Sequence, residues 1–290
     1  MPAVMNQIAA DELLVRASSP LSERPRPFLR WAGSKRGLLG QLIPHLPAEY
    51  GTYVEPFLGA GSMFFLLRPT TARLNDSCAE LIETYRAVRL DAEAVIEAAR
   101  AIPMEKDRYY QTRQNRSPEA TTRAGELLYL NRACFNGLYR VNSSGEFNVP
   151  WGAPKTDFVV DADNLRACSR ALAPQSVELT LGDFELALET CGAGDLVFLD
   201  PPYVTRHNNN GFIDYNERLF SWDDQRRLAS RAEELRAAGC HVIVTNAFHA
   251  EVLGLYPRFA VHELTRSSTL ASSSSRRGRV SEAILVGRPK

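Results

Sequence analysis

The sequence predicts an α/β fold, in which a mostly helical domain is inserted into a mostly parallel, doubly wound sheet. Short apolar runs rich in β-branched residues alternate with helical stretches, which is typical of layered α/β cores. This alternation stops between residues 91 and 173, where helical patterning leads into a stretch rich in Asn, Gly and Ser. We therefore expect a discontinuous core, 27–90 and 174–290, interrupted by a domain at 91–173. A flexible leader, 1–26, rich in Ala, Ser and Pro, precedes it.

The core elements follow from the apolar pattern. Five short, continuous apolar runs are the expected strands, as for strands that are covered on both faces: Thr52–Glu55, Arg73–Asn75, Asp195–Asp200, His241–Asn246 and Glu282–Gly287. Four stretches are the expected helices: Gly37–His45, Met63–Leu67, Glu80–Arg89 and Asp223–Ala238. Ser267–Ser275, with six serines, is expected to be a polar loop.

Composition excludes several classes of protein. Hydrophobic residues make up 44% of the chain, which is enough for a real core and excludes a disordered protein. No apolar run approaches the roughly 18 residues that a membrane span needs, and no signal peptide is recognised. The five cysteines contain no C-x-x-C pair, and the five histidines are scattered. We therefore expect a cytoplasmic protein with reduced thiols and no metal site.

The charge balance predicts only modest non-specific attraction to nucleic acid. Lysine plus arginine and aspartate plus glutamate number 34 each, whereas a DNA-binding protein usually has a basic excess. Basic residues do gather locally, because Thr265–Arg279 holds four arginines and no acid. Residues 105–123 and 132–155 each carry a basic surplus of two. The neutral total charge therefore does not exclude a local phosphate-binding track.

The strongest chemical signal is Asp200-Pro201-Pro202-Tyr203, directly after the apolar run Leu196–Leu199. A carboxylate at the carboxyl end of a buried strand stands where open α/β sheets bind ligands. The first proline forces Asp200 into an extended conformation. Asp200 and the Pro201 carbonyl then offer two acceptors for the hydrogens of an NH2 group, and Tyr203 offers an aromatic face to a base. The alternative is a strand end followed by an ordinary proline turn.

A second signal is the glycine-rich turn after the first expected strand, which ends in Glu55. Gly59 and Gly61 let the backbone approach a ligand closely as the next helix begins. Phe64 stands where the dinucleotide fingerprint has its third glycine, so the turn suits a cofactor without pyrophosphate better than NAD. Asp76, at the end of the next expected strand, can bind ribose hydroxyls. Taken alone, this segment could equally be an ordinary tight turn.

These segments resemble those of the Dam-type (D12 class) DNA adenine-N6 methyltransferases. FLRWAGSKRGLL is similar to the family's N-terminal cofactor motif, VEPFLGAGSMFF to its glycine motif and FLDPPY to its catalytic motif. YLNRACFNGLYRVNSSGEFNVPWG (Tyr129–Gly152) resembles its DNA-recognition loop and hairpin, and RSSTLASSSSRRGRVSEAILVG its closing loop and strand. The match runs from Phe28 to Gly287, in the family's order. The chain departs from the usual pattern at Gly33-Ser34 and at Ala133-Cys134.

The resemblance implies a class I methyltransferase core that uses S-adenosylmethionine and no metal. Lys35 would pair with the cofactor's carboxylate and Asp76 with its ribose, while Asp200 through Tyr203 would hold the target adenine. The full set of residues expected to contact the cofactor is Trp31, Lys35, Glu55, Phe57, Gly59, Gly61, Asp76 and Asp200.

The resemblance also implies a DNA-reading surface. Phe135 would wedge into the base stack, and Arg140 would read a guanine, for which arginine is the common bidentate partner. Gly145-Glu146, after Asn142, is expected to form a hairpin turn. The residues expected to contact DNA are Arg132, Phe135, Asn136, Leu138, Arg140, Asn142, Pro150, Arg276 and Arg277.

The expected activity is methylation of adenine N6 in double-stranded DNA by a protein acting as a monomer, with the target base flipped out. GATC is the expected target, because Leu138-Tyr139-Arg140 resembles the GATC-specific group. Two alternatives stay open: a methyltransferase acting on RNA or on a protein amide, and a DNA-binding regulator that has lost catalysis.

Overall fold

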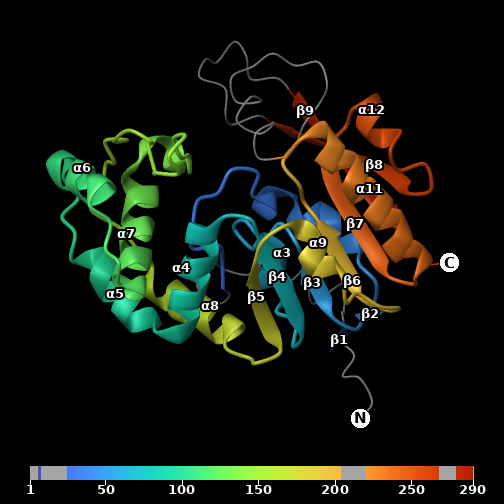
Figure 1. The fold of residues 1–290 in the computed structure, drawn as a ribbon, viewed down its shortest axis with the longest axis horizontal. Coiled ribbons are helices and arrows are strands. Elements are labelled where there is room, and N and C mark those ends of the chain that lie inside the picture. Colours follow the sequence, from blue (N-terminus) through green and yellow to red (C-terminus); the bar gives the residue numbers. More distant parts are fainter. Residues whose placement is uncertain (1–5, 8–24, 204–219, 268–278, 290) are drawn as a thin grey trace. The chain divides into compact units, whose positions relative to one another are not determined.

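The computed structural model describes residues 6–7, 25–203, 220–267 and 279–289 (Figure 1). Seven strands form one sheet in the order β5-β4-β3-β6-β7-β9-β8. Their bounds are β3 (Tyr53–Glu55), β4 (Ala72–Asp76), β5 (Val177–Leu181), β6 (Leu196–Leu199), β7 (His241–Ala247), β8 (Ala260–Ser267) and β9 (Arg279–Gly287). The pairs β4/β5, β3/β6 and β6/β7 are parallel, whereas β9 pairs antiparallel with both β7 and β8. The predicted mostly parallel α/β sheet is confirmed.

The chain divides into two compact units. The first comprises Met1–Ala10, Gln41–Phe57 and Phe184–Lys290, and the second Asp11–Gly40 and Leu58–Asp183. Strands β4 and β5 belong to the second unit and the other five to the first. The boundaries of the expected core and inserted domain stay a prediction.

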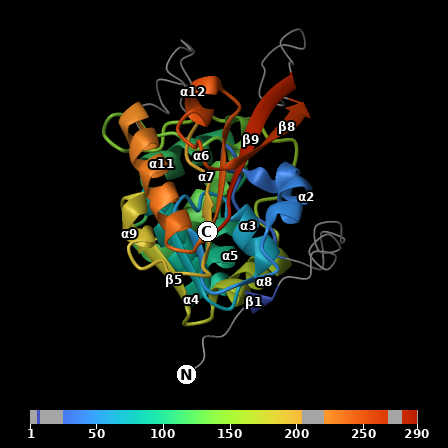
Figure 2. The same ribbon diagram turned by 90° about the vertical axis from the view of Figure 1, so that its right-hand side faces the viewer.

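The first unit is built around β6 and β7. All four residues of β6 are buried, and Val242 and Val244 of β7 have no exposed surface, so these strands read as continuous apolar runs. Helix α11 (Trp222–Ala237), the orange helix in Figure 2, packs against β7 and β9 and begins with a capping box between Ser221 and Asp224. The unit's other described elements are short: η2 (Ile43–His45), α9 (Phe184–Leu188), α12 (Ala250–Leu253) and the strand pair β1 (Asn6–Gln7) and β2 (Glu49–Tyr50).

The second unit is mostly helical, as expected for residues 91–173. Its described helices include η1 (Lys35–Leu38), α3 (Ser62–Leu67), α4 (Ala79–Leu90), α5 (Ala92–Arg100), α6 (Lys106–Gln114), α7 (Ala120–Ala133), η3 (Phe135–Gly137) and α8 (Ala162–Leu172). Helix α7 is buried from Ala124 to Asn131 and packs against α4, α5 and α6. Its last turns join an apolar cluster that includes Tyr109, Tyr129 and Phe147. This cluster supports the chain that follows α7.

The hairpin turn after α7 is confirmed. Val141 and Phe147 form an antiparallel bridge, and the Asn142 N–H donates to the Glu146 carbonyl at 2.9 Å. Gly145 has a φ of +78°, a left-handed conformation that favours glycine. This geometry explains the spacing of Asn142 and Gly145 in the sequence.

Two expectations about local structure need correction. The stretch Gly37–His45 is not one helix but three consecutive pieces, namely η1 (Lys35–Leu38), α2 (Leu39–Leu42) and η2. Pro44 is the second residue of the last piece, and a proline cannot donate the backbone hydrogen bond that would continue the helix. Strand β8 was not expected, because this edge strand lacks a continuous apolar run: residues 260–263 are exposed and Leu264 is buried. Most of the predicted serine-rich loop lies outside the described residues.

Candidate active site

Asp200 is the first residue after β6, and a partner on β7 holds its side chain. The parallel register places Leu199 opposite Val244, so the next residues, Asp200 and Thr245, meet at the carboxyl ends of their strands. The Thr245 hydroxyl donates to Asp200 Oδ1 at 2.6 Å. Thr245 is fully buried, whereas Asp200 is only partly buried. The predicted placement of Asp200 at the end of a buried strand is therefore confirmed.

Tyr203 is anchored through its hydroxyl, which donates to Glu282 Oε2 on β9 at 2.8 Å. Glu282 has only 1% of its surface exposed. Burial, with the negative charges of Asp200 and Glu282 nearby, holds the pKa of the Tyr203 phenol well above its ordinary value. The phenol therefore stays protonated at neutral pH and acts as a donor.

The second proline of the motif, Pro202, is fixed by a chain of amide hydrogen bonds. Gln225 Nε2 on α11 donates to the Pro202 carbonyl at 3.2 Å, and Asn246 Nδ2 donates to Gln225 Oε1 at 3.0 Å. Gln225 and Asn246 are both fully buried, as is Pro201. Sequence reasoning missed the supporting residues Thr245, Asn246, Gln225 and Glu282. The signal for two of them was the pair Thr245-Asn246, two polar residues inside an otherwise apolar strand.

Glu55 and Phe57 lie in the first unit, at and just after the end of β3. The Tyr53 hydroxyl donates to Glu55 Oε2 at 2.9 Å, and Glu55 is almost fully buried. Burial, with the Glu55 charge beside it, raises the pKa of Tyr53 well above its ordinary value. Phe57 stacks on Phe184, with ring centroids 5.4 Å apart, and meets Phe220 edge to face. The cofactor contacts expected of Glu55 and Phe57 stay predictions.

The glycine-rich turn lies in the second unit and is tied to the end of β4. Gly59 and Gly61 both have positive φ, +47° and +65°, as their role in a tight turn requires. The Gly59 N–H donates to Asp76 Oδ2 at 2.9 Å, and the Cys78 N–H donates to Asp76 Oδ1 at 3.0 Å. Burial raises the pKa of Asp76, while the backbone N–H groups that face it oppose the rise. The structure thus brings together Gly59, Gly61 and Asp76.

Trp31 joins this turn. A Cβ built on Gly59 would lie 3.1 Å from Trp31 Cδ1, so the glycine allows the indole to approach the backbone. Trp31 also contacts Tyr139 of the hairpin, which stacks on it with ring centroids 4.7 Å apart and an interplanar angle of 23°. Tyr139 in turn donates to Glu80 Oε2 at 3.1 Å. The contact between Trp31 and the hairpin was not foreseen from the sequence.

Lys35 is buried at the start of η1. Its ammonium group donates to the Gly33 carbonyl at 2.7 Å, and only 4% of its surface is exposed. Gly33 itself has a φ of +80°, which turns its carbonyl back toward the ammonium. The predicted pairing of Lys35 with a cofactor carboxylate stays a prediction.

The residues expected to wedge into and read DNA lie in the second unit, around η3 and the hairpin. Phe135 exposes 52% of its surface although it is a large apolar residue, and its N–H is held by the Pro150 carbonyl at 2.9 Å. Asn136 is exposed and has a φ of +55°, which points to a constrained loop. Leu138 packs on the apolar cluster below the hairpin. Arg140 is exposed, and its Nε donates to Asn148 Oδ1 at 2.7 Å.

The remaining recognition candidates have other contacts. Asn142 Oδ1 accepts from the backbone N–H groups of Ser144 and Glu146, so this side chain builds the hairpin turn. Arg132 donates to the Phe158 carbonyl at 3.0 Å and covers the ring of Phe158. Arg276 and Arg277 lie outside the described residues.

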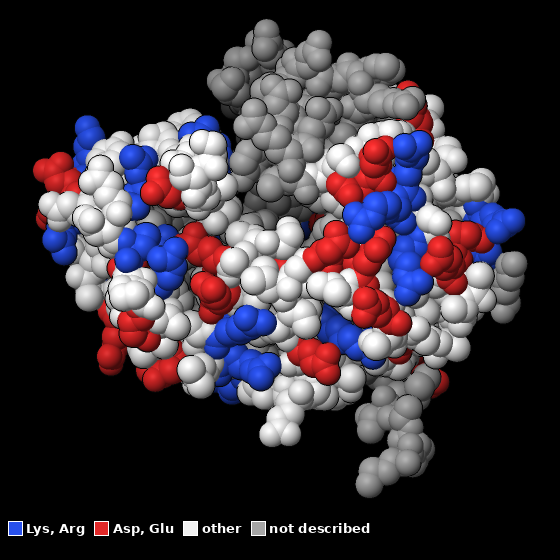
Figure 3. All heavy atoms as spheres, in the orientation of Figure 1, with Lys and Arg blue, Asp and Glu red and all other residues white. Residues whose placement is uncertain are grey.

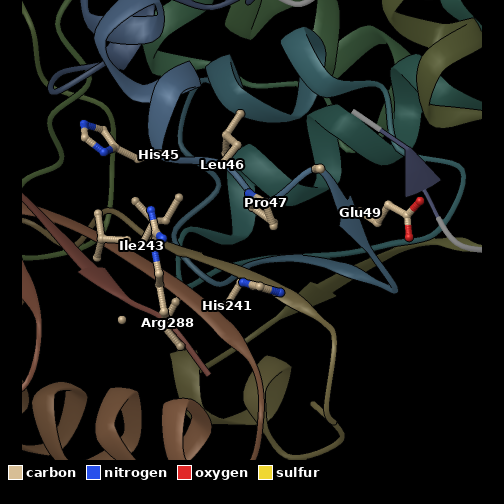
Figure 4. Close-up of a pocket in the computed structure, with 11 residues that line it drawn as sticks. His45, Leu46, Pro47, Glu49, His241, Ile243 and Arg288 are labelled. Carbon is tan, nitrogen blue, oxygen red and sulfur yellow. The ribbon is translucent and has the colours of Figure 1, made fainter. Parts of the chain in front are cut away.

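A groove of about 480 Å³ lies at the opposite end of the first unit's strands, near the start of β7. Figure 4 shows His45, His241 and Arg288 around it. Open α/β sheets bind their ligands at the carboxyl ends of parallel strands. Asp200 and Thr245 stand at that end, so we place the candidate active site there and not in the groove.

The surface in Figure 3 carries no large area of one charge among the described residues. Several arginines of α11 are paired with acids of the same helix: Arg226 with Asp223, Arg227 with Asp224, Arg231 with Glu234 and Arg236 with Glu233. Within the described ranges we found no group of three or more His, Cys, Asp or Glu side chains that could hold a metal ion. The helices described there are also too short or too polar to cross a membrane.

Comparison with known proteins gives the same assignment as the motifs. The type II methyltransferase M1.LlaDCHI of Lactococcus lactis subsp. cremoris is 35% identical over 269 residues, covering 90% of this chain and 95% of that protein. The type II methyltransferase M.MjaIII of Methanocaldococcus jannaschii is 32% identical, covering 87% and 95%. The DNA adenine methylase of Escherichia coli K12 is 30% identical, covering 92% and 97%. A family model described as D12 class N6 adenine-specific DNA methyltransferase matches residues 31–270. The chain therefore belongs to the D12 class of N6 adenine-specific DNA methyltransferases.

Proposed function

We propose that the protein transfers a methyl group from S-adenosylmethionine to N6 of an adenine flipped out of double-stranded DNA, at GATC sequences, and that it acts as a monomer. The observation that carries the proposal is the environment of Asp200. This carboxylate follows a buried strand, precedes two prolines and an aromatic residue, and is held by a buried hydroxyl at 2.6 Å. Such an arrangement suits a neutral amine that must be held in one orientation.

The donors and acceptors of the second unit fit a nucleoside cofactor. Asp76 accepts backbone hydrogen bonds from Gly59, Cys78 and Ser77, and a carboxylate has about four acceptor positions. It therefore retains capacity for ribose hydroxyls. The turn at Gly59 and Gly61, with Trp31 beside it, offers close backbone approach and an aromatic edge. We propose these residues as the cofactor site, with Lys35, Glu55 and Phe57 as further contacts.

When bound, the cofactor supplies a methyl group already activated by its sulfonium. In our proposal the chain's own residues orient the nucleophile. Asp200 and the Pro201 carbonyl accept the two hydrogens of the adenine amino group, which leaves the nitrogen lone pair directed at the methyl carbon. As the nitrogen–carbon bond forms, the sulfur–carbon bond breaks, S-adenosylhomocysteine leaves, and the amino nitrogen releases one of its two protons to solvent. Tyr203 offers its ring face to the base, and its anchored hydroxyl limits rotation of that ring. Holding the groups in line supplies the alignment that a direct displacement needs.

We further propose that the recognition hairpin reads the DNA. Phe135 is a large exposed aromatic residue on a constrained loop, which suits a residue that fills the space of an extruded base. Arg140 is exposed near the start of the hairpin. Asn148 accepts from its Nε at Oδ1 and from its Nη2 at the backbone carbonyl, 3.4 Å away, and the remaining guanidinium N–H groups can face a base edge. In this account residues 91–173 form the recognition domain, and 27–90 with 174–290 form the catalytic domain.

Methyl transfer to three classes of substrate tests the proposal. The protein is incubated with tritiated S-adenosylmethionine and, separately, with unmethylated DNA, RNA and a protein mixture. We expect label in DNA alone, and in duplexes that contain GATC at least ten times faster than in duplexes with one base of that site replaced. Label in RNA or protein would instead support those activities. DNA binding without transfer would indicate a regulator that has lost catalysis.

A further inference from the structure

We propose that Thr245 is a positioning residue for the Asp200 carboxylate, within a buried polar support beneath the Asp-Pro-Pro-Tyr motif. We name this support, consisting of Gln225, Thr245, Asn246 and Glu282, the polar floor. The inference rests on the proposed function and deepens it, because it identifies what holds the amine-binding carboxylate in place.

The first observation is burial. Gln225, Thr245 and Asn246 have no exposed surface, and Glu282 has 1%. Burying a polar side chain costs free energy unless it is hydrogen-bonded, and apolar residues would fill these places without that cost. The three preceding residues of β7, 242–244, are apolar. A cluster of four buried polar side chains at this place therefore calls for a reason other than packing.

The second observation is where their hydrogen bonds go. The polar floor contacts three of the four motif residues, and Tyr203 faces Thr245 as well as Glu282. Thr245 donates to Asp200 at 2.6 Å, Gln225 donates to the Pro202 carbonyl at 3.2 Å, and Glu282 accepts from Tyr203 at 2.8 Å. Asn246 Nδ2 donates to Gln225 Oε1 at 3.0 Å and so holds the Gln225 side chain. The supports come from α11, β7 and β9, so three separate elements converge on one short segment.

The third step concerns geometry. An aspartate side chain without a local partner can rotate, and its terminal torsion is broad. A short hydrogen bond from a β-branched, fully buried donor removes that freedom, because the Thr245 side chain is itself stiff. This bond takes one of the roughly four acceptor positions of the carboxylate. Thr245 thus acts through Asp200 and does not need to contact the substrate.

The test is a pair of substitutions at one position. Thr245→Val keeps the shape and removes the donor, whereas Thr245→Ser keeps the donor. We expect the single-turnover rate of methyl transfer to fall about 10- to 100-fold in Thr245→Val, since hydrogen bonds to charged groups and correct alignment contribute on this scale. The KM for S-adenosylmethionine and the affinity for DNA should change less than twofold. Thr245→Ser should restore the rate to within about threefold of wild type.

A matched control is Thr84→Val. The Thr84 hydroxyl is also buried and donates, at 2.7 Å, but to the Glu80 carbonyl within α4. Its loss should leave the transfer rate unchanged, so a comparable fall there would overturn the specific role of Thr245. Equal losses in Thr245→Val and Thr245→Ser would overturn it as well, because the hydroxyl would not be the cause.

Two outcomes separate this inference from the proposed function. If Asp200→Ala is inactive while Thr245→Val transfers methyl at the wild-type rate, the positioning role is wrong and the proposed function stands. If Asp200→Ala stays active, the proposed function itself is wrong. Should Thr245→Val not fold, Thr245→Cys takes its place, because a thiol is a weaker donor of similar size. A rate at least threefold below wild type is then expected, and a wild-type rate overturns the role.

Discussion

Replacing Gly61 by alanine should strain the turn that we propose for the cofactor, by an amount that the structure allows us to estimate. Gly61 has a φ of +65°, and a left-handed conformation costs a residue with a Cβ about 1–2 kcal/mol. The new Cβ would also lie 2.9 Å from the Tyr85 hydroxyl oxygen and 3.3 Å from a ring carbon of Phe65. Moving packed neighbours typically costs a further 1–3 kcal/mol or so. Together these costs should lower the free energy of unfolding of Gly61→Ala by roughly 2–5 kcal/mol.

Two comparisons separate the backbone cost from the steric one. Gly145→Ala places a Cβ at a φ of +78° with nothing within 4 Å, so it should lose only the backbone share, about 1–2 kcal/mol. The Tyr85→Phe variant lacks the clashing oxygen. Gly61→Ala should therefore lower the free energy of unfolding less in the Tyr85→Phe protein than in the wild type. The same tyrosine donates to the Gly59 carbonyl at 3.1 Å. Its displacement should therefore also raise the KM for S-adenosylmethionine.

Thermal denaturation and cofactor titration measure these effects. At about 2–4 °C per kcal/mol, Gly61→Ala should melt roughly 4–20 °C below wild type. Gly145→Ala should leave the KM for S-adenosylmethionine unchanged. The reasoning is refuted if Gly61→Ala melts no lower than Gly145→Ala, or if its KM equals that of the wild type.

Three further predictions follow from the described contacts. Asp76→Ala should raise the KM for S-adenosylmethionine about 10- to 100-fold, since hydrogen bonds to a charged acceptor are worth about 1.5–3 kcal/mol; unchanged affinity in a cofactor titration would place the ribose elsewhere. Arg140→Ala should erode preference at one guanine position by about 1–3 kcal/mol in competition assays at two salt concentrations, whereas a uniform loss would make it a phosphate contact. Burial, with His262 and Arg288 nearby, lowers the pKa of His45, and burial with Arg288 lowers that of His241. Each histidine therefore has a higher pKa in the unfolded chain, 6.5, than in the folded protein. The unfolded chain takes up protons first as the pH falls, so the free energy of unfolding should decrease below pH 6.5. The melting temperature should thus drop between pH about 7.5 and 5.5, and less so in a His45→Gln, His241→Gln double variant; an equal drop would assign the loss to other groups.

The position of Asp200 could be predicted from the sequence because it depends on local rules. An apolar run of strand length followed by two prolines fixes a buried strand, an extended residue and a chain that leaves the sheet. Asp76 and the glycine turn followed from the same reasoning. The hairpin turn was equally local, since Asn142 and Gly145 carry their conformational preferences with them.

The supporting contacts depend on tertiary structure and could not be predicted in this way. Glu282 reads as an ordinary residue at the start of a strand, yet antiparallel pairing of β9 with β7 buries it under Tyr203. Tyr139 stacks on Trp31, which lies more than a hundred residues earlier in the chain. Asn142 was expected to meet DNA, but its amide oxygen accepts two backbone hydrogen bonds of its own turn. In each case partners distant in sequence, or a choice between several possible partners, decide the contact.

The most direct test of the central claim is the chemical identity of the modified base. Unmethylated plasmid is incubated with S-adenosylmethionine and either the wild-type protein or Asp200→Ala, then digested to nucleosides and analysed by mass spectrometry. We predict N6-methyladenosine in the deoxy form with the wild-type protein, and less than a tenth of that turnover with Asp200→Ala, whose DNA affinity should largely survive. Methylation on cytosine, or an Asp200→Ala protein that retains more than a tenth of the activity, would contradict the account.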